Sequence, residues 1–200
     1  DINTNPNNPI IGSRSFGEDK FSVTNKSLSY LKGMQSEGIM GSAKHFPGHG
    51  DTSTDSHKTL PIINFSAKRI NEVELFPYKK LIDNNLSSVM VAHMEVPSLE
   101  KEPKMPSTLS KNIISKLLKK KLKFEGLVIT DAMDMKGVVD FNKNQSADVS
   151  ALLAGNDILL MPDDLDESTK SIRNAIDNGI ISEKRLKYSV KKILMAKYKA

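Results

Sequence analysis

The sequence of 200 residues contains no cysteine and no tryptophan. Without cysteine there is no disulfide framework, no thiolate zinc site and no cysteine nucleophile. Long hydrophobic runs are missing too, since stretches such as 127–129 and 158–161 are far too short to span a bilayer. Residues 1–6 have neither the basic nor the apolar region of a signal peptide. These absences exclude several classes of protein and leave the compartment open.

An excess of positive charge is present but small: 29 Lys and Arg residues against 24 Asp and Glu give a net charge of +5. Much of this charge lies in residues 116–123. In and just before this segment, apolar residues recur at helical spacing: Ile113, Ile114, Leu117 and Leu118. We therefore favour a buried apolar stripe with a solvated lysine face over a site for a polyanion. A nucleic-acid site would also need base-stacking aromatics, and only Phe124 is nearby. No nucleic-acid partner is predicted.

Short β-rich runs alternate along the chain with longer segments of helical periodicity. The runs are 39–45, 88–92, 126–130 and 157–161; the helical segments are 26–37, 67–84, 110–121, 145–154, 165–178 and 182–198. Ser66 and Ser110 are the predicted N-caps of the second and third helices. Alternation of strand and helix is typical of βαβ units, so the sheet is predicted to be parallel.

Polar residues that could carry chemistry follow each predicted strand, which suits either a TIM barrel or a doubly wound sheet. The sequence has no G-x-G-x-x-G after a strand and no P-loop, and this favours the barrel. The predicted fold class is α/β, a TIM-like (β/α)8 barrel. Four strands are about half of the eight that closure needs. Residues 1–200 are therefore expected to be the C-terminal half to two-thirds of one barrel domain, with about three βα units upstream of Asp1.

Three of the four histidines fall within residues 44–57, together with two aspartates and a lysine. One proline and two glycines in this segment prevent a helix, so the i, i+4 spacing of His45 and His49 does not place them on one helix face. A loop whose histidines bond only to the backbone would explain one or two of them. A metal site built from His45, His49, Asp55 and His57 stays open as an alternative.

Asp55 and His57 form a sharper feature within this segment. In extended backbone, residues two apart point to the same side. A carboxylate beside an imidazole holds one tautomer and stabilises the protonated ring, which prepares the histidine for general acid/base work. The pair is therefore a candidate proton donor and acceptor.

A second candidate is Asp131, which follows the apolar residues 127–130. A carboxylate at the mouth of a buried parallel strand is costly unless it is hydrogen-bonded, and an N-cap role is the alternative. Asp134 is the second choice for any role given to Asp131. Hydrolysis of a glycosidic bond needs a carboxylate on one side and a proton donor on the other, which Asp131 and the Asp55–His57 pair would supply.

Other polar and methionine residues carry weaker signals. Arg14 lies in a loop rich in proline and asparagine, from which it could reach sugar hydroxyls or a carboxylate. His93 ends the second strand and is either a pocket residue or a satisfied core histidine. Met94, Met105, Met133 and Met135 are typical of residues that fill gaps in a core.

These patterns together resemble glycoside hydrolase family 3, in particular its bacterial β-N-acetylglucosaminidase branch. The resemblance rests on Lys-His-Phe-Pro-Gly-His-Gly at 44–50, Asp-Ser-His at 55–57, Val-Met-Val-Ala-His at 89–93, Gly-Leu-Val-Ile-Thr-Asp-Ala-Met at 126–133 and the opening residues 1–17. It extends over residues 1–198, with several long motifs in the same order.

The resemblance implies a TIM-like barrel and a retaining mechanism. Asp131 would be the nucleophile that forms a covalent glycosyl-enzyme, and His57, oriented by Asp55, would be the acid/base. Residues that grip N-acetylglucosamine would be Arg14, Lys44 and His45, with His93 and Met133 lining the same pocket. No metal and no organic cofactor are implied. The expected substrates are N-acetylglucosaminides of cell-wall muropeptides, which favours the cell envelope or secretion over the cytoplasm.

Several alternatives stay open beside this resemblance. A histidine acid would not repel an anion, so phosphate could replace water in the second half-reaction. Family members carry a sugar-binding aspartate upstream of the segment that matches Asp1, so the chain alone is expected to be inactive and to be part of a longer polypeptide with further domains. A metal-dependent hydrolase using His45, His49 and His57 and a non-catalytic sugar-binding fragment are the other two readings.

Overall fold

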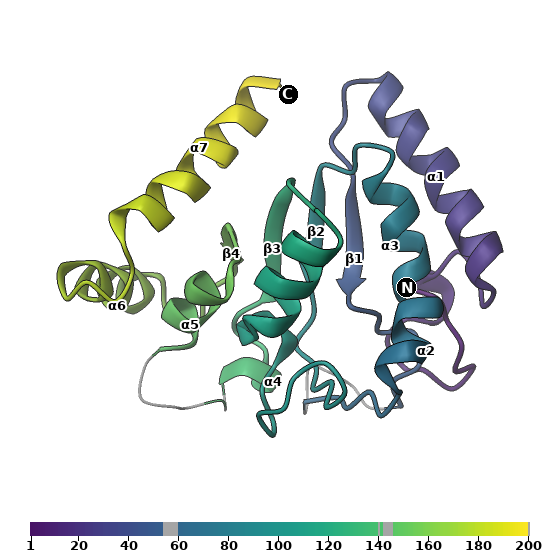
Figure 1. The fold of residues 1–200 in the computed structure, drawn as a ribbon, viewed down its shortest axis with the longest axis horizontal. Helices are drawn as coiled ribbons and strands as arrows, with labels where there is room; N and C mark the ends of the chain where they lie inside the picture. The colour runs from purple at the N-terminus through teal and green to yellow at the C-terminus, as the bar shows by residue number, and fades with distance from the viewer. Residues whose placement is uncertain (54–59, 140, 142–145, 200) are drawn as a thin grey trace.

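The computed structural model describes residues 1–199 except 54–59, 140 and 142–145, and it has four parallel strands flanked by helices (Figure 1). The strands pair in chain order, each parallel to the next. They are β1 (Ser42–Phe46), β2 (Ser88–Val91), β3 (Leu127–Ala132) and β4 (Ile158–Leu160). The predicted parallel sheet is confirmed, and its strand boundaries agree with the predicted ones to within three residues.

Helices fill the connections between the strands and follow the last one. They are α1 (Lys20–Ser36), α2 (Ala67–Glu72), α3 (Leu75–Ile82), a π-helix (Asn112–Lys121), α4 (Lys136–Val139), α5 (Ala147–Ala154), α6 (Leu165–Asp177) and α7 (Glu183–Lys199). Short 3-10 turns lie at Gly12–Arg14 and Ser107–Leu109. Among the described residues, no helix is both long enough and apolar enough to cross a bilayer.

Helix caps explain where several of these helices begin. Asp19 accepts hydrogen bonds from the backbone N–H groups of Phe21 and Ser22, so α1 starts six residues before its predicted start at residue 26. The predicted cap Ser66 is confirmed, since its Oγ accepts from Arg69 N at 3.2 Å. Ser110 Oγ accepts from Ile113 N at 3.1 Å, but the residue directly before the helix is Lys111, whose side chain makes no capping hydrogen bond.

One predicted helix, over residues 67–84, is wrong as a single element. The chain breaks at Val73, and α2 and α3 form in its place. Pro77 lies in the first turn of α3, where its missing N–H costs no intrahelical hydrogen bond. A helix continuous from residue 67 would place Pro77 in its interior, so the break has a direct steric reason.

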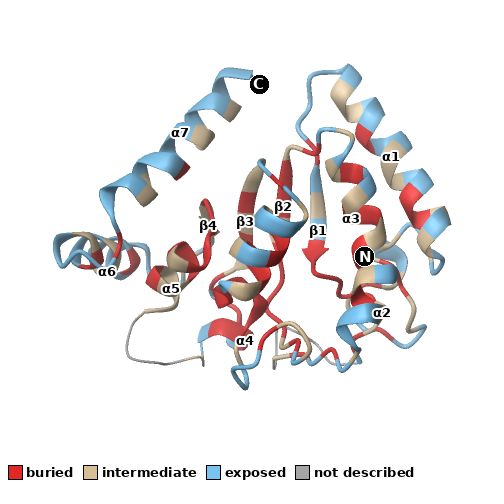
Figure 2. Cartoon of the chain, viewed as in Figure 1, coloured by how far each residue is buried: buried red, intermediate tan, exposed pale blue. Residues whose placement is uncertain are grey.

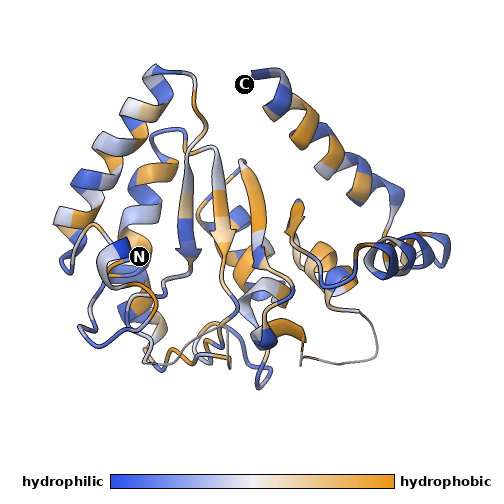
Figure 3. Cartoon of the chain, turned by 180° about the vertical axis from the view of Figure 1, so that it is seen from behind, coloured by the Kyte–Doolittle hydropathy of each residue, from blue (hydrophilic) through white to orange (hydrophobic). Residues whose placement is uncertain are grey.

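The main core lies between the sheet and the helices that cover it. Phe46, Val89 and Val128 are fully buried on successive strands, and Figure 2 shows the buried residues concentrated along the central strands. In Figure 3 strands β2 and β3 are largely apolar, while β1 and α6 are mostly hydrophilic. The predicted apolar stripe of the π-helix is confirmed, because Ile113, Ile114, Leu117 and Leu118 are all buried against this core.

The lysine face of that helix is only partly solvated. Lys116 and Lys120 are exposed as predicted, but Lys119 is largely buried and contacts the Asp157 carboxylate at 3.4 Å. Its amino group also donates to the Gly155 carbonyl oxygen. The prediction of a wholly solvated lysine face is therefore wrong at Lys119, because a buried acid from the next βα unit lies within reach.

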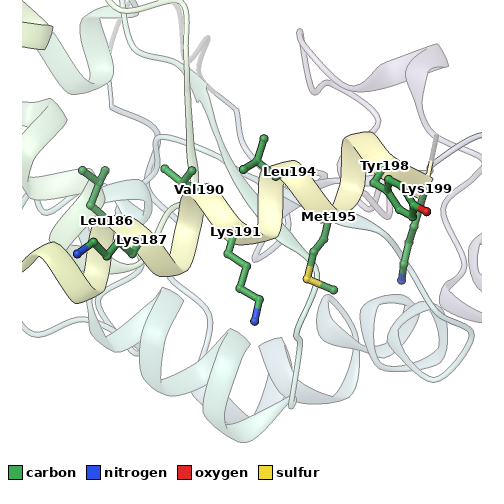
Figure 4. Close-up of a pocket in the computed structure, with 8 residues that line it drawn as sticks. All are labelled: Leu186, Lys187, Val190, Lys191, Leu194, Met195, Tyr198 and Lys199. Atoms are coloured by element: carbon green, nitrogen blue, oxygen red, sulfur yellow. The ribbon is translucent and has the colours of Figure 1, made fainter.

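Helix α7 makes polar contacts on one side and leaves apolar side chains exposed on another. Lys192 and Ser189 contact Asp157, at the start of β4. Apolar side chains line an open groove along the helix, drawn in Figure 4: Leu186, Val190, Leu194, Met195 and Tyr198. Tyr198 is 94% exposed and Leu194 60% exposed. None of these side chains belongs to an apolar core cluster of the described residues.

Candidate active site

The candidate active site lies at the carboxyl ends of β1, β2 and β3, the edge where parallel strands bring their following loops together (Figure 1). The residues after β1 and the first residues of the chain lie side by side there. Asn5 N donates to Gly50 O at 3.2 Å, and Asn8 Nδ2 donates to His49 O at 2.8 Å. The opening segment thus packs directly on the histidine-rich loop.

Asp1 is the centre of these contacts and was not predicted as a site residue. Its Oδ1 accepts from the backbone N–H groups of His45 at 3.0 Å and His49 at 2.7 Å. Its Oδ2 lies 2.7 Å from His45 Nδ1, and its backbone nitrogen donates to Lys44 O at 2.8 Å. The side chain is only 5% exposed. One carboxylate therefore holds both ends of the loop that joins the two histidines.

Glycines allow this loop to pack closely against its neighbours. A Cβ on Gly50 would lie 1.7 Å from the Ile2 carbonyl oxygen, and one on Gly48 would lie 2.8 Å from Glu74 Cβ. Gly48 also has φ +141°, a conformation that other residues rarely adopt. No helix forms in the described part of the segment 44–57, as the proline and glycines predicted.

Both described histidines of this segment are buried and electrically neutral near pH 7. Burial lowers the pKa of His45 to about 3, although the charge of Asp131 acts in the opposite direction. Burial likewise lowers the pKa of His49 to about 4, and the neighbouring His45 lowers it further. His49 Nδ1 lies 2.7 Å from Thr52 Oγ1, while its Nε2 is buried with no hydrogen-bond partner in the described structure.

Asp131 lies within β3, whose last residue is Ala132, two residues later than the predicted strand end. Its Oδ1 accepts from Ala132 N at 2.9 Å, and the side chain is half-buried. The next helix starts only at Lys136, so Asp131 does not cap that helix. Its charge raises the pKa of both His45 and His49, which places the carboxylate within electrostatic reach of the two rings. Asp134 is exposed.

His93 and Met133 are both buried, with almost no exposed surface. His93 is fully buried; Nδ1 pairs with Thr108 Oγ1, and Nε2 donates to Ala132 O at 2.9 Å. Burial lowers its pKa, so the ring is neutral and orders the end of β3. Met133 is 3% exposed and belongs to an apolar cluster with Leu109 and Val138. Their contact with substrate stays a prediction.

Arg14 and Lys44 are the exposed cations of this region. Both line a cavity of about 480 Å³ between α1, β1 and α3. Arg14 Nη1 donates to Ile10 O at 3.3 Å, which steers the guanidinium within its own loop. The positive charges of Arg14 and Lys44 both lower the pKa of His45, so the two groups lie near that ring. The lining of that cavity includes Asp1 but neither His45 nor Asp131.

The predicted acid/base pair, Asp55 and His57, lies outside the described residues. Within the residues that the structure describes, no three His, Asp or Glu side chains are grouped to hold a metal ion. Since the metal alternative also needs His57, it remains untested. His45 and His49 by themselves form an edge-to-face ring pair with centroids 5.7 Å apart.

Comparison with known proteins fixes the family. The sequence model of the Glycosyl hydrolase family 3 N terminal domain matches residues 1–196. The chain belongs to glycosyl hydrolase family 3. A β-hexosaminidase A from Pseudoalteromonas piscicida is 38% identical over 172 residues, which cover 81% of this chain and 29% of that protein.

Solved structures of family 3 proteins share the fold. A β-N-acetylglucosaminidase from Paenibacillus is 36% identical with a TM-score of 0.93, over 100% of this chain and 38% of that one. A β-glucoside phosphorylase is 28% identical with a TM-score of 0.95, over 100% of this chain and 37% of that one. The TIM-like α/β fold class is thereby confirmed, and the chain spans roughly a third of the length of these relatives.

Proposed function

We propose that this chain carries much of the active site of a retaining exo-glycosidase that hydrolyses terminal β-linked N-acetylglucosamine. The observation that carries the proposal is the half-buried Asp131 carboxylate at the end of β3, within electrostatic reach of two neutral histidines. Membership of glycosyl hydrolase family 3 and similarity to proteins named β-hexosaminidase and β-N-acetylglucosaminidase support it.

In the first half-reaction, an Asp131 oxygen attacks the anomeric carbon and forms a covalent glycosyl-enzyme. The bond to the leaving-group oxygen breaks as that oxygen takes a proton from His57, which Asp55 orients. In the second half-reaction, His57 removes a proton from water, whose oxygen attacks the anomeric carbon and releases Asp131. Two inversions at one carbon give net retention.

In this scheme the sugar is held by two cations and one neutral imidazole. Arg14 and Lys44 supply positive charge and hydrogen-bond donors, and His45 supplies a neutral ring nitrogen. His93 and Met133 support the pocket wall at the ends of β2 and β3. We take muropeptides bearing a terminal N-acetylglucosamine as the natural substrates.

Residues 1–200 are, in this proposal, one part of the catalytic barrel domain, completed by further βα units. Two features support this: β1 and β4 are the edge strands of the sheet that the described residues form, and apolar side chains of α7 are exposed. Free strand edges and apolar helix faces are the surfaces by which barrel units pack on one another. The isolated chain is accordingly expected to be inactive.

Phosphorolysis is the second candidate for the deglycosylation step. The similarity to a β-glucoside phosphorylase over the whole chain favours it. Phosphate would then attack the anomeric carbon in place of water and yield a sugar 1-phosphate. A neutral histidine leaves room for that anion, whereas a second carboxylate would repel it.

The test uses the complete natural protein and an aryl N-acetyl-β-glucosaminide. Proton NMR should detect the β-anomer of N-acetylglucosamine first, and Asp131→Asn should lower kcat by about 10⁴-fold. Asp134→Asn, three residues away and exposed, is the matched control and should stay within a few-fold of wild type. An initial α-anomer, or a loss confined to Asp134→Asn, would overturn the assignment.

The same assay separates the other readings. Added phosphate diverts product to the 1-phosphate only if phosphorolysis operates. A chelator abolishes turnover only in the metal-dependent hydrolase. A binding fragment would show sugar affinity without turnover, and Asp131→Asn would leave that affinity nearly unchanged.

A further inference from the structure

Both carboxylate oxygens of Asp1 contact the candidate active site. Its two carboxylate oxygens receive three hydrogen bonds of 2.7–3.0 Å, and all of them come from His45 and His49. The acid and the imidazole are both nearly excluded from water, with side chains 5% and 6% exposed. Hydrogen bonds to a carboxylate in such surroundings are strong and directional.

The chemistry of the contact with His45 fixes where its ring proton lies. A carboxylate only accepts hydrogen bonds, so the 2.7 Å contact requires a proton on Nδ1. In a neutral imidazole the other nitrogen, Nε2, then carries a lone pair. Burial keeps the pKa of this ring well below its ordinary value, and Lys44 and Arg14 act in the same direction. The neutral Nδ1–H tautomer is the form that satisfies every partner.

We propose that Asp1 is a positioning residue that fixes His45 in the Nδ1–H tautomer, so that Nε2 accepts a hydrogen bond from a hydroxyl of the bound sugar. The sugar part rests on the proposed function. The tautomer part stands on the geometry of the two side chains. Through Oδ1 the same carboxylate also holds the His45 and His49 backbone nitrogens, which orients the ring and the loop together.

Replacement by asparagine separates this role from a purely structural one. In Asp1→Asn, the amide oxygen can still accept from the two backbone N–H groups, so the loop keeps those contacts. The amide nitrogen, however, would donate to His45 Nδ1 and force the proton onto Nε2. The variant side chain keeps the shape of Asp1 while the His45 tautomer is reversed. Reversing the tautomer is costly where a carboxylate orients a catalytic histidine.

The decisive readout is the ¹⁵N chemical shifts of the His45 and His93 side chains, assigned in the complete natural protein. In wild type, we expect His45 with a protonated Nδ1 and an unprotonated Nε2. In Asp1→Asn the assignment should reverse, while His93, which donates from Nε2 to Ala132 O, keeps its signals and reports on folding. A doubly protonated His45, the opposite wild-type tautomer, or no change in Asp1→Asn would overturn the proposal.

Kinetics test the consequence for the sugar. Asp1→Asn should lower kcat/KM for the aryl N-acetyl-β-glucosaminide by about 10- to 100-fold, the cost of one mispaired buried hydrogen bond. Asp1→Glu should recover part of this loss. A substrate lacking the hydroxyl that meets His45 should lose activity in wild type but little further in Asp1→Asn. If wild type hydrolyses no glycoside, the proposed function fails, and the NMR result still decides the tautomer.

Discussion

Gly50 is where the backbone of the candidate active site is most tightly packed, because a Cβ there would collide with the Ile2 carbonyl carbon and oxygen. Neither atom belongs to a flexible side chain, so the segment that carries Asp1 would have to move. Since Asn5 N also donates to Gly50 O, that movement would break a hydrogen bond between the two segments. The close packing of this loop against the opening residues therefore requires that residue 50 has no Cβ.

Gly50→Ala should lower the free energy of unfolding by about 3 kcal/mol, as for other overpacked sites, and should abolish turnover. Gly33→Ala is the matched control, because no atom lies within 4 Å of its added Cβ and the position is inside α1. There alanine should stabilise by up to about 1 kcal/mol. Urea unfolding measures the stability of both variants. Equal changes in the free energy of unfolding at the two positions would contradict the close packing at Gly50.

For single residues, the sequence indicates candidates for the site but not which residues they contact. Asp131 is a candidate because it stands at the end of an apolar run, whereas Lys44 and His45 are candidates through the resemblance to family 3. Asp1 was missed, since its partners are 44 and 48 positions away and its own neighbours have no period. Only the match of residues 1–17 to a family motif could have pointed to it.

Helix α7 is held at its base by a buried acid rather than by an apolar face. Asp157 has no exposed side-chain surface, and its carboxylate contacts Lys119, Lys192 and Ser189. Burial alone would raise the pKa of Asp157, but these cations and the hydroxyl hold it below its ordinary value. The carboxylate is therefore charged and links the π-helix, β4 and α7.

Asp157→Asn should cost about 3–5 kcal/mol of stability, because it leaves two partly buried ammonium groups without their counter-charge. Glu183→Gln is the control on the same helix. Its salt bridge to Lys187 is fully exposed and screened by solvent, so its loss should leave the stability nearly unchanged. Hydrogen exchange of α7 amides should rise in the first variant only. Equal protection in both would mean that Asp157 does not hold the helix.

Element boundaries depended on local chemistry that periodicity does not contain. The start of α1 was missed because Phe21 and Val23 are two positions apart, which is not helical spacing, although Asp19 is a strong cap. The break at Val73 was missed because the apolar pattern of 67–84 continues through it. The π-helix at Asn112–Lys121 carries the same apolar stripe as an α-helix of that length would, so periodicity alone cannot distinguish the two.

For the whole molecule, the parallel α/β architecture followed from the sequence because strand and helix signals alternate along it. The positions of segments that meet across long distances in the sequence could not be predicted in this way. The course of α7 and the approach of residues 1–8 to the loop after β1 both depend on side chains distant in sequence. The buried state of the histidines is likewise a property of the assembled fold.

That burial makes the stability of the protein depend on pH. The pKa of His49 is about 4 in the folded protein and about 6.5 when unfolded, so the unfolded chain binds more protons between these values. Stability should thus be full above pH 6.5 and fall as the pH drops towards 4, with His49 contributing up to about 3 kcal/mol.

His49→Asn tests this dependence, because its amide replaces Nδ1 beside Thr52 and cannot titrate. Urea unfolding from pH 7 to 4 should give a shallower decline in the variant than in wild type. The remaining decline belongs to other buried groups whose pKa is lowered in the same direction, among them His45 and His93. Parallel pH profiles for variant and wild type would show that His49 does not titrate on unfolding.

In the proposed mechanism, Asp131 forms a covalent bond to the sugar. The most direct measurement is incubation of the complete natural protein with a 2-deoxy-2-fluoro β-glycoside bearing a good leaving group, followed by intact-mass analysis and peptide mapping. We predict the addition of one sugar, carried by Asp131. A sugar on Asp134, or folded protein that acquires none, would contradict the account.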